Sequence, residues 1–419
     1  MTGYARLLLI TLVGLLAAFG GFNFVVDPYA LNDWSVPGVN ERRTRAHEDG
    51  LRVPVGDHLG RTQAQSVLLG SSRVVDGFPD RVETWPGGLY NAGMRGTNAF
   101  ELAHAAALAG ADANLRCLVI GLDINEFNAA EKFKPAFPVS RLSDGSRLLS
   151  RLRVALSPNT FMRSIQTIAD NLTGGSDDFP FKDAYQPGQQ RGWFLDTVRG
   201  YPAASTLRVD PARLDFLFAA LERLSSSGVQ VIGFLHPVHA FNEEALFATG
   251  REQTYFAFRR EIAARFASLS GDPLAPCAPG GQGVLWDFAG FQPPALSALP
   301  AADQTRPHPT HHEPAHYVPA LGLAMLGRIQ ARPVNATDFG VRLTPMNARP
   351  TADAIRARRA AYMAGDAGAL LREAAGPYLD ANPAAPSSAP LTPADLRGLD
   401  RLLDDVAMRR ARLSRAEAS

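Results

Sequence analysis

The stretch Ser66-Val67-Leu68-Leu69-Gly70-Ser71-Ser72-Arg73 decides the fold that we expect for this chain. A run of roughly four to eight apolar residues that ends at a glycine favours a buried parallel strand over a helix. Ligands of open α/β sheets bind at the carboxyl ends of such strands. We therefore expect Ser71 and Ser72 at the mouth of a sheet. The simpler alternative is a strand-to-helix turn in which a serine only caps the helix.

From residue 65 onwards, apolar runs alternate with segments of helical periodicity. The expected strands lie at 67–70, 88–91, 115–122, 229–235 and 284–288. The expected helices lie at 98–109, 211–225 and 243–269, with a last one that ends near residue 329. This alternation predicts an α/β fold in which a parallel sheet is covered by helices on both faces, a flavodoxin-like three-layer sandwich.

Two regions depart from the alternation. Residues 126–205 are rich in proline and glycine and contain one helical piece near 161–172, which indicates an insertion over the strand ends within the 65–332 domain. Residues 333–419 are expected to form a helical C-terminal extension. It would contain a flexible Pro/Ala-rich spacer at 376–392 and a charged helix at 394–416.

The N-terminal segment predicts a membrane anchor. Residues 7–26 carry no charge and, as a helix, would span a hydrocarbon layer of about 30 Å. Arg6 precedes this run, so the positive-inside rule assigns residues 1–26 to a cytoplasmic tip and transmembrane helix. Residues 27–64 would then be a membrane-proximal linker, and the main domain would be extracytoplasmic. A cleaved signal peptide is the alternative, but the apolar run continues where a cleavage site is expected.

The balance of charges argues against a nucleic-acid partner, and the two cysteines leave a disulfide possible. The 42 basic residues balance the 41 acidic residues, so nothing indicates a nucleic-acid partner. Cys117 lies in an apolar run and reads as a small buried hydrophobe. Cys277 lies in a Pro/Gly-rich loop, and a disulfide between the two cysteines would require an oxidising compartment.

Four separated sequence blocks occur in a meaningful order: Gly70-Ser71-Ser72, Asn91 to Gly96, Gly121-Leu122-Asp123 and Glu313-x-x-His316. Over residues 65–330 this order resembles the SGNH (GDSL-type) hydrolase superfamily, especially its membrane-anchored bacterial branch. That wider group includes acetyltransferases and esterases of surface polysaccharides. The resemblance implies that Ser72 is the nucleophile, that His316 is its base and that Glu313 orients the imidazole.

The resemblance also implies an oxyanion hole, with one departure. The family uses the serine N–H, a glycine N–H and an asparagine side chain, which correspond here to Ser72, Gly96 and Asp123. An ionised carboxylate cannot donate a hydrogen bond. One missing donor typically lowers the rate by about 10²–10³.

Further polar residues follow the same strand ends and are expected to contact substrate: Arg73, Asn91, Arg95, His236 and His239. The two arginines have two alternative roles. They either favour an anionic substrate or neutralise Asp76 and Asp123.

The histidine-rich segment suggests a metal site as a rival interpretation. His308, His312 and His316 are spaced by four, which would align them on one face of a helix. Prolines at 307, 309 and 314 argue against such a helix. We therefore expect neither a metal ion nor another cofactor.

Two functions from different classes remain. The first is a serine esterase or O-acyltransferase on the periplasmic side of a bacterial inner membrane, anchored through residues 7–26. It would act on a cell-envelope polysaccharide or other acylated substrate through an acyl-Ser72 intermediate. A transferase would also need a separate membrane protein as acyl donor. The alternative is a catalytically weak subunit of the same fold that binds carbohydrate or assists assembly of an envelope polysaccharide machinery, which the departure at Asp123 favours.

Overall fold

The computed structural model describes residues 3–32, 34–43, 51–59, 61–62, 64–174, 188–269, 277, 283–301, 303–304, 306–332 and 339–379. The chain forms two compact units that alternate along the sequence. Unit 1 consists of residues 1–61 and 134–184, and unit 2 of residues 62–133 and 185–419. The two units are described separately below.

Unit 2 is built on a seven-stranded sheet with the order β2-β3-β1-β4-β5-β6-β9. The five inner strands are parallel, and in chain order they read 2-1-3-4-5, a doubly wound arrangement. The short strands β2 and β9 pair antiparallel at the two edges. The bounds are β1 Ser66–Leu69, β2 Arg81–Val82, β3 Leu89–Asn91, β4 Cys117–Leu122, β5 Gln230–Leu235, β6 Val284–Asp287 and β9 Val341–Leu343.

Helices cover both faces of this sheet, so the predicted α/β sandwich with a mostly parallel sheet is confirmed. On one face, α3 (Ser72–Gly77) and α12 (Pro319–Ile329) bury Val74 and Met325 in one apolar cluster with Leu68 of β1. On the other face lie α4 (Ala99–Gly110), α9 (Pro211–Ser226) and α11 (Glu252–Ser268). There the Phe266 ring lies so close to Gly233 of β5 that an added Cβ would come within 2.2 Å of it.

Local sequence signals explain where two of these helices begin and end. Asn98 caps α4 by accepting hydrogen bonds from the N–H groups of Phe100 and Glu101, at the start of the helix expected over 98–109. The single helix expected over 243–269 is instead two helices, α10 (Ala240–Ala248) and α11. Gly250 adopts φ +75° between them, a left-handed conformation that ends a helix and suits glycine. That prediction of one continuous helix was wrong.

The region after residue 333 belongs to unit 2 rather than to a separate extension. Strand β9 completes the sheet, and α13 (Ala348–Ala364) and α14 (Asp366–Leu379) follow it. Leu371 of α14 shares a buried cluster with Tyr201 of α8 (Tyr201–Ala204) and Phe241 of α10. The spacer beyond residue 379 and the terminal helix expected at 394–416 lie outside the described residues.

One disulfide joins the core of unit 2 to a loop. Cys117, the first residue of β4, is bonded to Cys277, and their Cα atoms are 6.2 Å apart. Both residues are buried in the cluster beneath α12. The pairing that the sequence left open is thus present in the structure.

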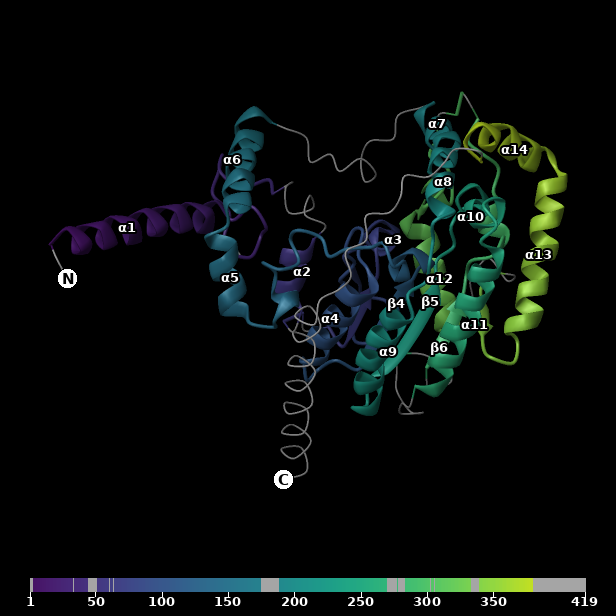
Figure 1. Cartoon of the computed structure of the whole chain (residues 1–419), viewed down its shortest axis with the longest axis horizontal. Coiled ribbons are helices and arrows are strands. Elements are labelled where there is room, and N and C mark those ends of the chain that lie inside the picture. Colours follow the sequence, from purple (N-terminus) through teal and green to yellow (C-terminus); the bar gives the residue numbers. More distant parts are fainter. Residues whose placement is uncertain are drawn as a thin grey trace. The chain divides into compact units, whose positions relative to one another are not determined.

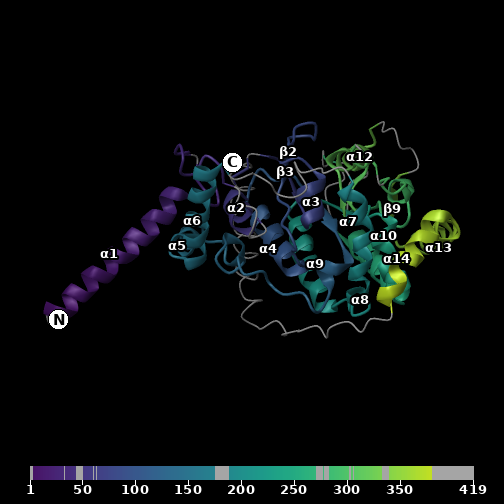
Figure 2. The same ribbon diagram turned by 90° about the horizontal axis from the view of Figure 1, so that it is seen from above.

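Unit 1 contains α1 (Gly3–Val26), α2 (Arg52–His58), α5 (Arg147–Ala155) and α6 (Pro158–Thr173). By length and composition, α1 can cross a membrane. Two views show α5 and α6 beside the C-terminal end of α1 (Figure 1, Figure 2). The region expected as one insertion over the strand ends is therefore divided, since residues 134–174 fold with α1 and residues 188–205 fold in unit 2.

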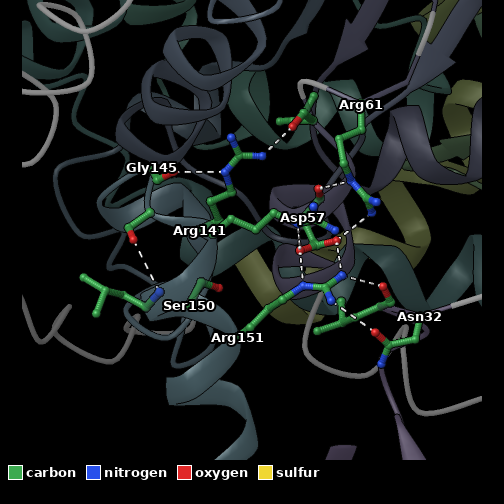
Figure 3. A network of polar contacts seen from close by, with 12 residues as sticks. Asn32, Asp57, Arg61, Arg141, Gly145, Ser150 and Arg151 are labelled. Carbon is green, nitrogen blue, oxygen red and sulfur yellow. Dashed lines mark hydrogen bonds and ion pairs between the residues drawn. The ribbon is translucent and has the colours of Figure 1, made fainter.

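A buried carboxylate holds the parts of unit 1 together (Figure 3). Asp57 of α2 accepts hydrogen bonds from Arg61, Arg147 and Arg151. Burial opposes its ionisation, but the hydrogen bonds from the arginines outweigh burial and lower the pKa of Asp57 to about 2. Arg151 also donates to the Leu31 carbonyl at 2.7 Å, which links α5 to the segment that follows α1. The stretch expected as a linker is therefore partly folded into unit 1.

Candidate active site

The end of β1 and the start of α3 are separated by only two residues. Gly70 permits this close turn, because an added Cβ would come within 2.4 Å of the Val74 side chain. Ser71 is the N-cap of α3 and Ser72 is its first residue. Both lie at the carboxyl edge of the sheet between β1 and β4, where the strand order reverses and doubly wound folds place their ligands.

The structure brings together the three side chains that the sequence selected. His316 Nε2 lies 2.6 Å from Ser72 Oγ, and its other ring nitrogen, Nδ1, hydrogen-bonds Glu313 Oε1. The side chains of His316 and Glu313 are 19% and 14% exposed, so the group is sheltered but reachable from solvent. With the proton of the imidazole on Nδ1, Nε2 can accept the serine proton.

Glu313 and His316 lie on a short hairpin ahead of α12. Strands β7 (His311–Glu313) and β8 (His316–Tyr317) pair antiparallel, and Pro314 and Ala315 form the connection. The hairpin sets the distance between the carboxylate and the imidazole across one cross-strand pair. Ala315 N–H donates to Glu313 Oε2 at 2.9 Å and so fixes the second carboxylate oxygen.

The electrostatics of Glu313 favour its ionised form. Burial would raise the pKa of this carboxyl, but the hydrogen bond and charge of His316 and the N–H of Ala315 outweigh burial. The pKa of Glu313 is therefore lowered. An ionised Glu313 can both orient His316 and stabilise its protonated form.

Asp123 has a different place from the one that its sequence position implied. It caps the 3-10 helix η2 (Ile124–Phe127), where Oδ1 accepts from Asn125 N–H at 2.8 Å. Its other oxygen, Oδ2, forms an ion pair with Arg73 Nη1. Both carboxylate oxygens are occupied as acceptors, so Asp123 supplies no oxyanion donor.

The two arginines are paired with the two aspartates, which is the second of the alternatives that the sequence left. Arg73 pairs with Asp123, and Arg95 binds Asp76 through both terminal nitrogens, at 2.8 and 2.5 Å. Asp76 follows Ser72 by four residues on α3, and its Oδ2 lies 4.0 Å from His316 Nε2. A helical spacing of four from the serine was the sequence signal that would have selected Asp76.

Gly96 lies in the turn after β3, with φ +58°. Met94 N–H, in the same turn, donates to the carbonyl of Gly70 at 2.9 Å and so ties the turn to the end of β1. The N–H of Ser72 is the first amide of α3 and has no partner within that helix. Ser72 and the turn that contains Gly96 thus lie at the same edge of the sheet.

Two residues expected to contact substrate are used for internal packing instead. Asn91 donates to the carbonyls of Val74 and Phe78 and accepts from Gly93 N–H. His239 is fully buried, and both of its ring nitrogens have partners: Nδ1 caps α10, and Nε2 hydrogen-bonds the Ser297 carbonyl. Their polar atoms hold α3 and α10 in place, so neither presents a free group to a ligand.

His236 lies behind the triad. Its Nδ1 hydrogen-bonds the Tyr317 hydroxyl at 3.0 Å, and its ring packs on Gly121, where an added Cβ would come within 2.5 Å. Burial, then the charges of Arg73 and His316, hold the pKa of His236 well below its usual value. His236 is therefore a neutral, buried support of the residue that follows His316.

A cavity of about 310 Å³ opens at the ends of β4 and β5. Asp123 and His236 line it, whereas Ser72, Glu313 and His316 do not, so the cavity lies beside the triad rather than around it. Its polar lining includes three asparagines and four charged residues: Asn125, Asn128, Asn242, Asp123, Glu131, Glu243 and Arg259. Its apolar lining includes Leu207, Leu246 and Phe258.

Two other histidines of the 308–316 segment hydrogen-bond two different backbone carbonyls. His308 Nε2 hydrogen-bonds the Ala298 carbonyl, and His311 Nε2 hydrogen-bonds the Pro237 carbonyl. Within the described part of the chain, no three His, Cys, Asp or Glu side chains are grouped so that they could hold a metal ion.

Comparison of the chain with protein-family models, with curated proteins and with solved structures finds no match.

Proposed function

We propose that the protein is a membrane-anchored, extracytoplasmic serine esterase or O-acyltransferase of the SGNH type. The observation that carries this proposal is the hydrogen-bonded series Ser72–His316–Glu313 at the carboxyl end of β1. A serine alone is a weak nucleophile, and a positioned imidazole with its own carboxylate is the usual means of activating it.

In the proposed reaction, Ser72 Oγ attacks the carbonyl carbon of an acyl ester while His316 Nε2 takes the serine proton. Glu313 stabilises the resulting imidazolium. The tetrahedral intermediate collapses, and His316 returns the proton to the departing alcohol oxygen. Water or a sugar hydroxyl then attacks the acyl-Ser72 ester in the same way, which releases the acid or transfers the acyl group.

The oxyanion that forms in each step needs donors. The N–H groups of Ser72 and Gly96 are two candidates. Arg73 is our third, because Nη2 of its guanidinium makes no hydrogen bond within the described residues, while Nε and Nη1 are fixed by Ala315 and Asp123. A guanidinium N–H can take over the role that an asparagine amide has in the family.

The substrate that we propose is an acylated glycan or other acylated component of the cell envelope. The neighbouring cavity supports this class, since the amides of Asn125, Asn128 and Asn242 suit neutral hydroxyl groups. The apolar helix α1 and the Cys117–Cys277 disulfide support a position outside the cytoplasm, anchored at the inner membrane. If the protein is a transferase, a separate membrane protein supplies the acyl group.

One observation favours the second candidate function, a binding or assembly subunit with little activity. Asp123 occupies the position of a conventional oxyanion donor and is fully used as an acceptor. If Arg73 does not replace that donor, the site would bind an acylated glycan without turning it over.

A fluorophosphonate probe separates the two functions. Full-length protein in detergent should be labelled on Ser72 alone, and Ser72→Ala and His316→Ala should abolish the label. Absence of labelling in the folded wild type would reject the enzyme and leave the binding subunit. An alkaline phosphatase fused after residue 379 should be active in cells if unit 2 is extracytoplasmic, and inactive if it is cytoplasmic.

A further inference from the structure

Helices α5 and α6 of unit 1 have the reverse of a normal surface pattern. On α6, the side chains of Thr160, Ser164 and Thr167 are buried, whereas Met162 is 53% exposed and Leu172 is 73% exposed. A helix on the surface of a water-soluble domain buries its apolar face and exposes its polar face.

Helix α5 also exposes an apolar face. Leu148 and Leu152 are spaced by four residues and lie on one side of the helix, and Leu156 is its exposed C-cap residue. Leu148 is 71% exposed, and Ser150 on the other side is buried. The apolar platform, as we name this surface, consists of Leu148, Leu149, Leu152, Leu156, Met162, Ile165 and Leu172.

The platform is not a general property of the protein surface. Apart from α1 and the platform, few large apolar side chains are exposed in the described residues. In the larger unit 2 they are Leu323, Val341, Met346 and Leu379, which lie on separate elements. Exposed apolar side chains are therefore concentrated on the two helices that contact α1, and a concentration of this kind indicates an interaction.

The platform is continuous with the proposed membrane anchor. The ring of Phe161, at the start of α6, stacks on Phe19 with centroids 4.9 Å apart and also contacts Phe22. Phe19 lies seven residues before the end of α1, which is about 10 Å along the helix axis. The start of α6 is thus beside a part of α1 that would lie within the hydrocarbon layer.

The contacts between α1 and these helices are of the kind that membrane helices use. Asn23 of α1 accepts from the Ser164 hydroxyl at 2.9 Å and donates to the Ala155 carbonyl at 2.8 Å. Gly20 allows close approach, since an added Cβ would come within 3.3 Å of Leu156. Small residues and interhelical polar contacts hold helices together in lipid. These contacts make α1 a packed part of unit 1.

We propose that α5 and α6 dock into the lipid bilayer through the apolar platform. Unit 1 is then partly embedded in the membrane, and α1 is only one part of its anchor. The lipid acyl chains take the place that a protein core would occupy. This inference concerns unit 1 alone and stands whether or not Ser72 is catalytic.

Spin labels on the full-length protein in phospholipid nanodiscs test the proposal. Single cysteines would replace Leu148 and Leu152 on α5 and Ile165 and Leu172 on α6, with Leu12→Cys as the lipid reference and Glu222→Cys as the water reference. The native cysteines are buried and paired, so they should not take the label.

We expect all four platform labels to be accessible to oxygen and protected from a water-soluble nickel chelate, like the label at residue 12. Accessibility to nickel, as at residue 222, would overturn the proposal and leave the platform in water. Protection from both reagents would also overturn it, because a partner protein or a second copy would then cover the platform. Two positions on each helix guard against a single variant that fails to fold.

Discussion

Arg73 Nε donates a hydrogen bond of 2.8 Å to the carbonyl oxygen of Ala315, the residue that directly precedes His316. The same guanidinium pairs with Asp123 at the end of β4. Because Arg73 directly follows Ser72, one side chain connects the proposed nucleophile, the hairpin of the proposed base and the neighbouring strand. Long-range polar contacts of this kind fix the geometry on which a proposed triad depends.

Ser72 and His316 should act as a unit. Ser72→Ala and His316→Ala should each reduce hydrolysis of a small acetyl ester by at least about 10³-fold, and the double variant should be little worse than either. Ser71→Ala is the matched control, because it removes the adjacent hydroxyl and should change the rate little. Additive losses in the double variant would contradict a shared proton-transfer step.

The proposed role of Glu313 should tolerate a shorter side chain better than the loss of its negative charge. Glu313→Gln keeps the size of the side chain but removes the negative charge that orients and stabilises the protonated His316, so kcat should fall by about 10²–10⁴. Glu313→Asp keeps the charge with a shorter reach and should retain more activity than Gln. Steady-state kinetics on the same small ester measure both variants. A Gln variant that remains as active as the wild type would remove Glu313 from the mechanism.

Arg73 should matter through its guanidinium rather than its charge alone. Arg73→Lys keeps the charge but cannot contact Ala315 and Asp123 together, so kcat should fall by about 10²-fold, nearly as much as in Arg73→Ala. Asp123→Asn keeps the cap of η2 but loses the ion pair, and should lower kcat by about tenfold. If Asp123→Asn instead raises kcat, Asn supplies a donor that the wild type lacks, and Arg73 is not the third donor.

The cavity beside the triad should contribute to binding of the glycan. Ala203 is exposed on α8 and lines the cavity, so Ala203→Trp should narrow it without disturbing the core. KM for an acetylated oligosaccharide should rise by about tenfold, while kcat/KM for a small ester stays within about twofold. Ala129→Trp, also exposed but outside the cavity lining, is the control. If both variants change KM for the oligosaccharide equally, the cavity does not bind the substrate.

Asp57 should make unit 1 sensitive to acid. Its pKa is lowered from 3.8 to about 2 in the folded protein, so it stabilises unit 1 fully above pH 3.8 and progressively less as the pH falls towards 2. Asp57→Asn should cost about 2 kcal/mol at neutral pH and abolish this acid dependence. Hydrogen exchange of α2 and α5 in nanodiscs measures the effect. Asp144→Asn, whose carboxylate pairs with the exposed Arg153, should change little.

Local pattern predicted the five inner strands, because each is a largely apolar run next to a turn. The edge strands β2 and β9 have only two and three residues and were not predicted. Gly70 marks a tight turn because it has no Cβ, and Asn98 can cap a helix because its side chain accepts hydrogen bonds from backbone N–H groups. Both features depend on one residue and its sequence neighbours, so they can be interpreted from the sequence. The order of the blocks also selected Ser72, Glu313 and His316, which the structure brings together.

Contacts between distant segments could not be predicted in this way. The pairing of Arg73 with Asp123 depends on the neighbouring positions of β1 and β4, and no local spacing encodes it. The role of Asn91 in packing likewise depends on where α3 ends. Helix α6 reads as an ordinary amphipathic helix, because only its packing on α1 decides which of its faces is buried.

The division of the chain into units also has a consequence for biosynthesis. The polypeptide leaves unit 1 at residue 61 and returns to it at residue 134, after β1, β3 and β4 have been made. A chain that leaves the ribosome N-terminus first cannot complete unit 1 until α6 has been made. Strands β1, β3 and β4 can pair with β5 and β6 only later still, because those strands follow α6 in the sequence. Cutting the chain after α1 would therefore remove a partner of α5 and α6 rather than release a finished domain. Isolating unit 2 requires deletion of two separate segments, 1–61 and 134–184, rather than of the N-terminus alone.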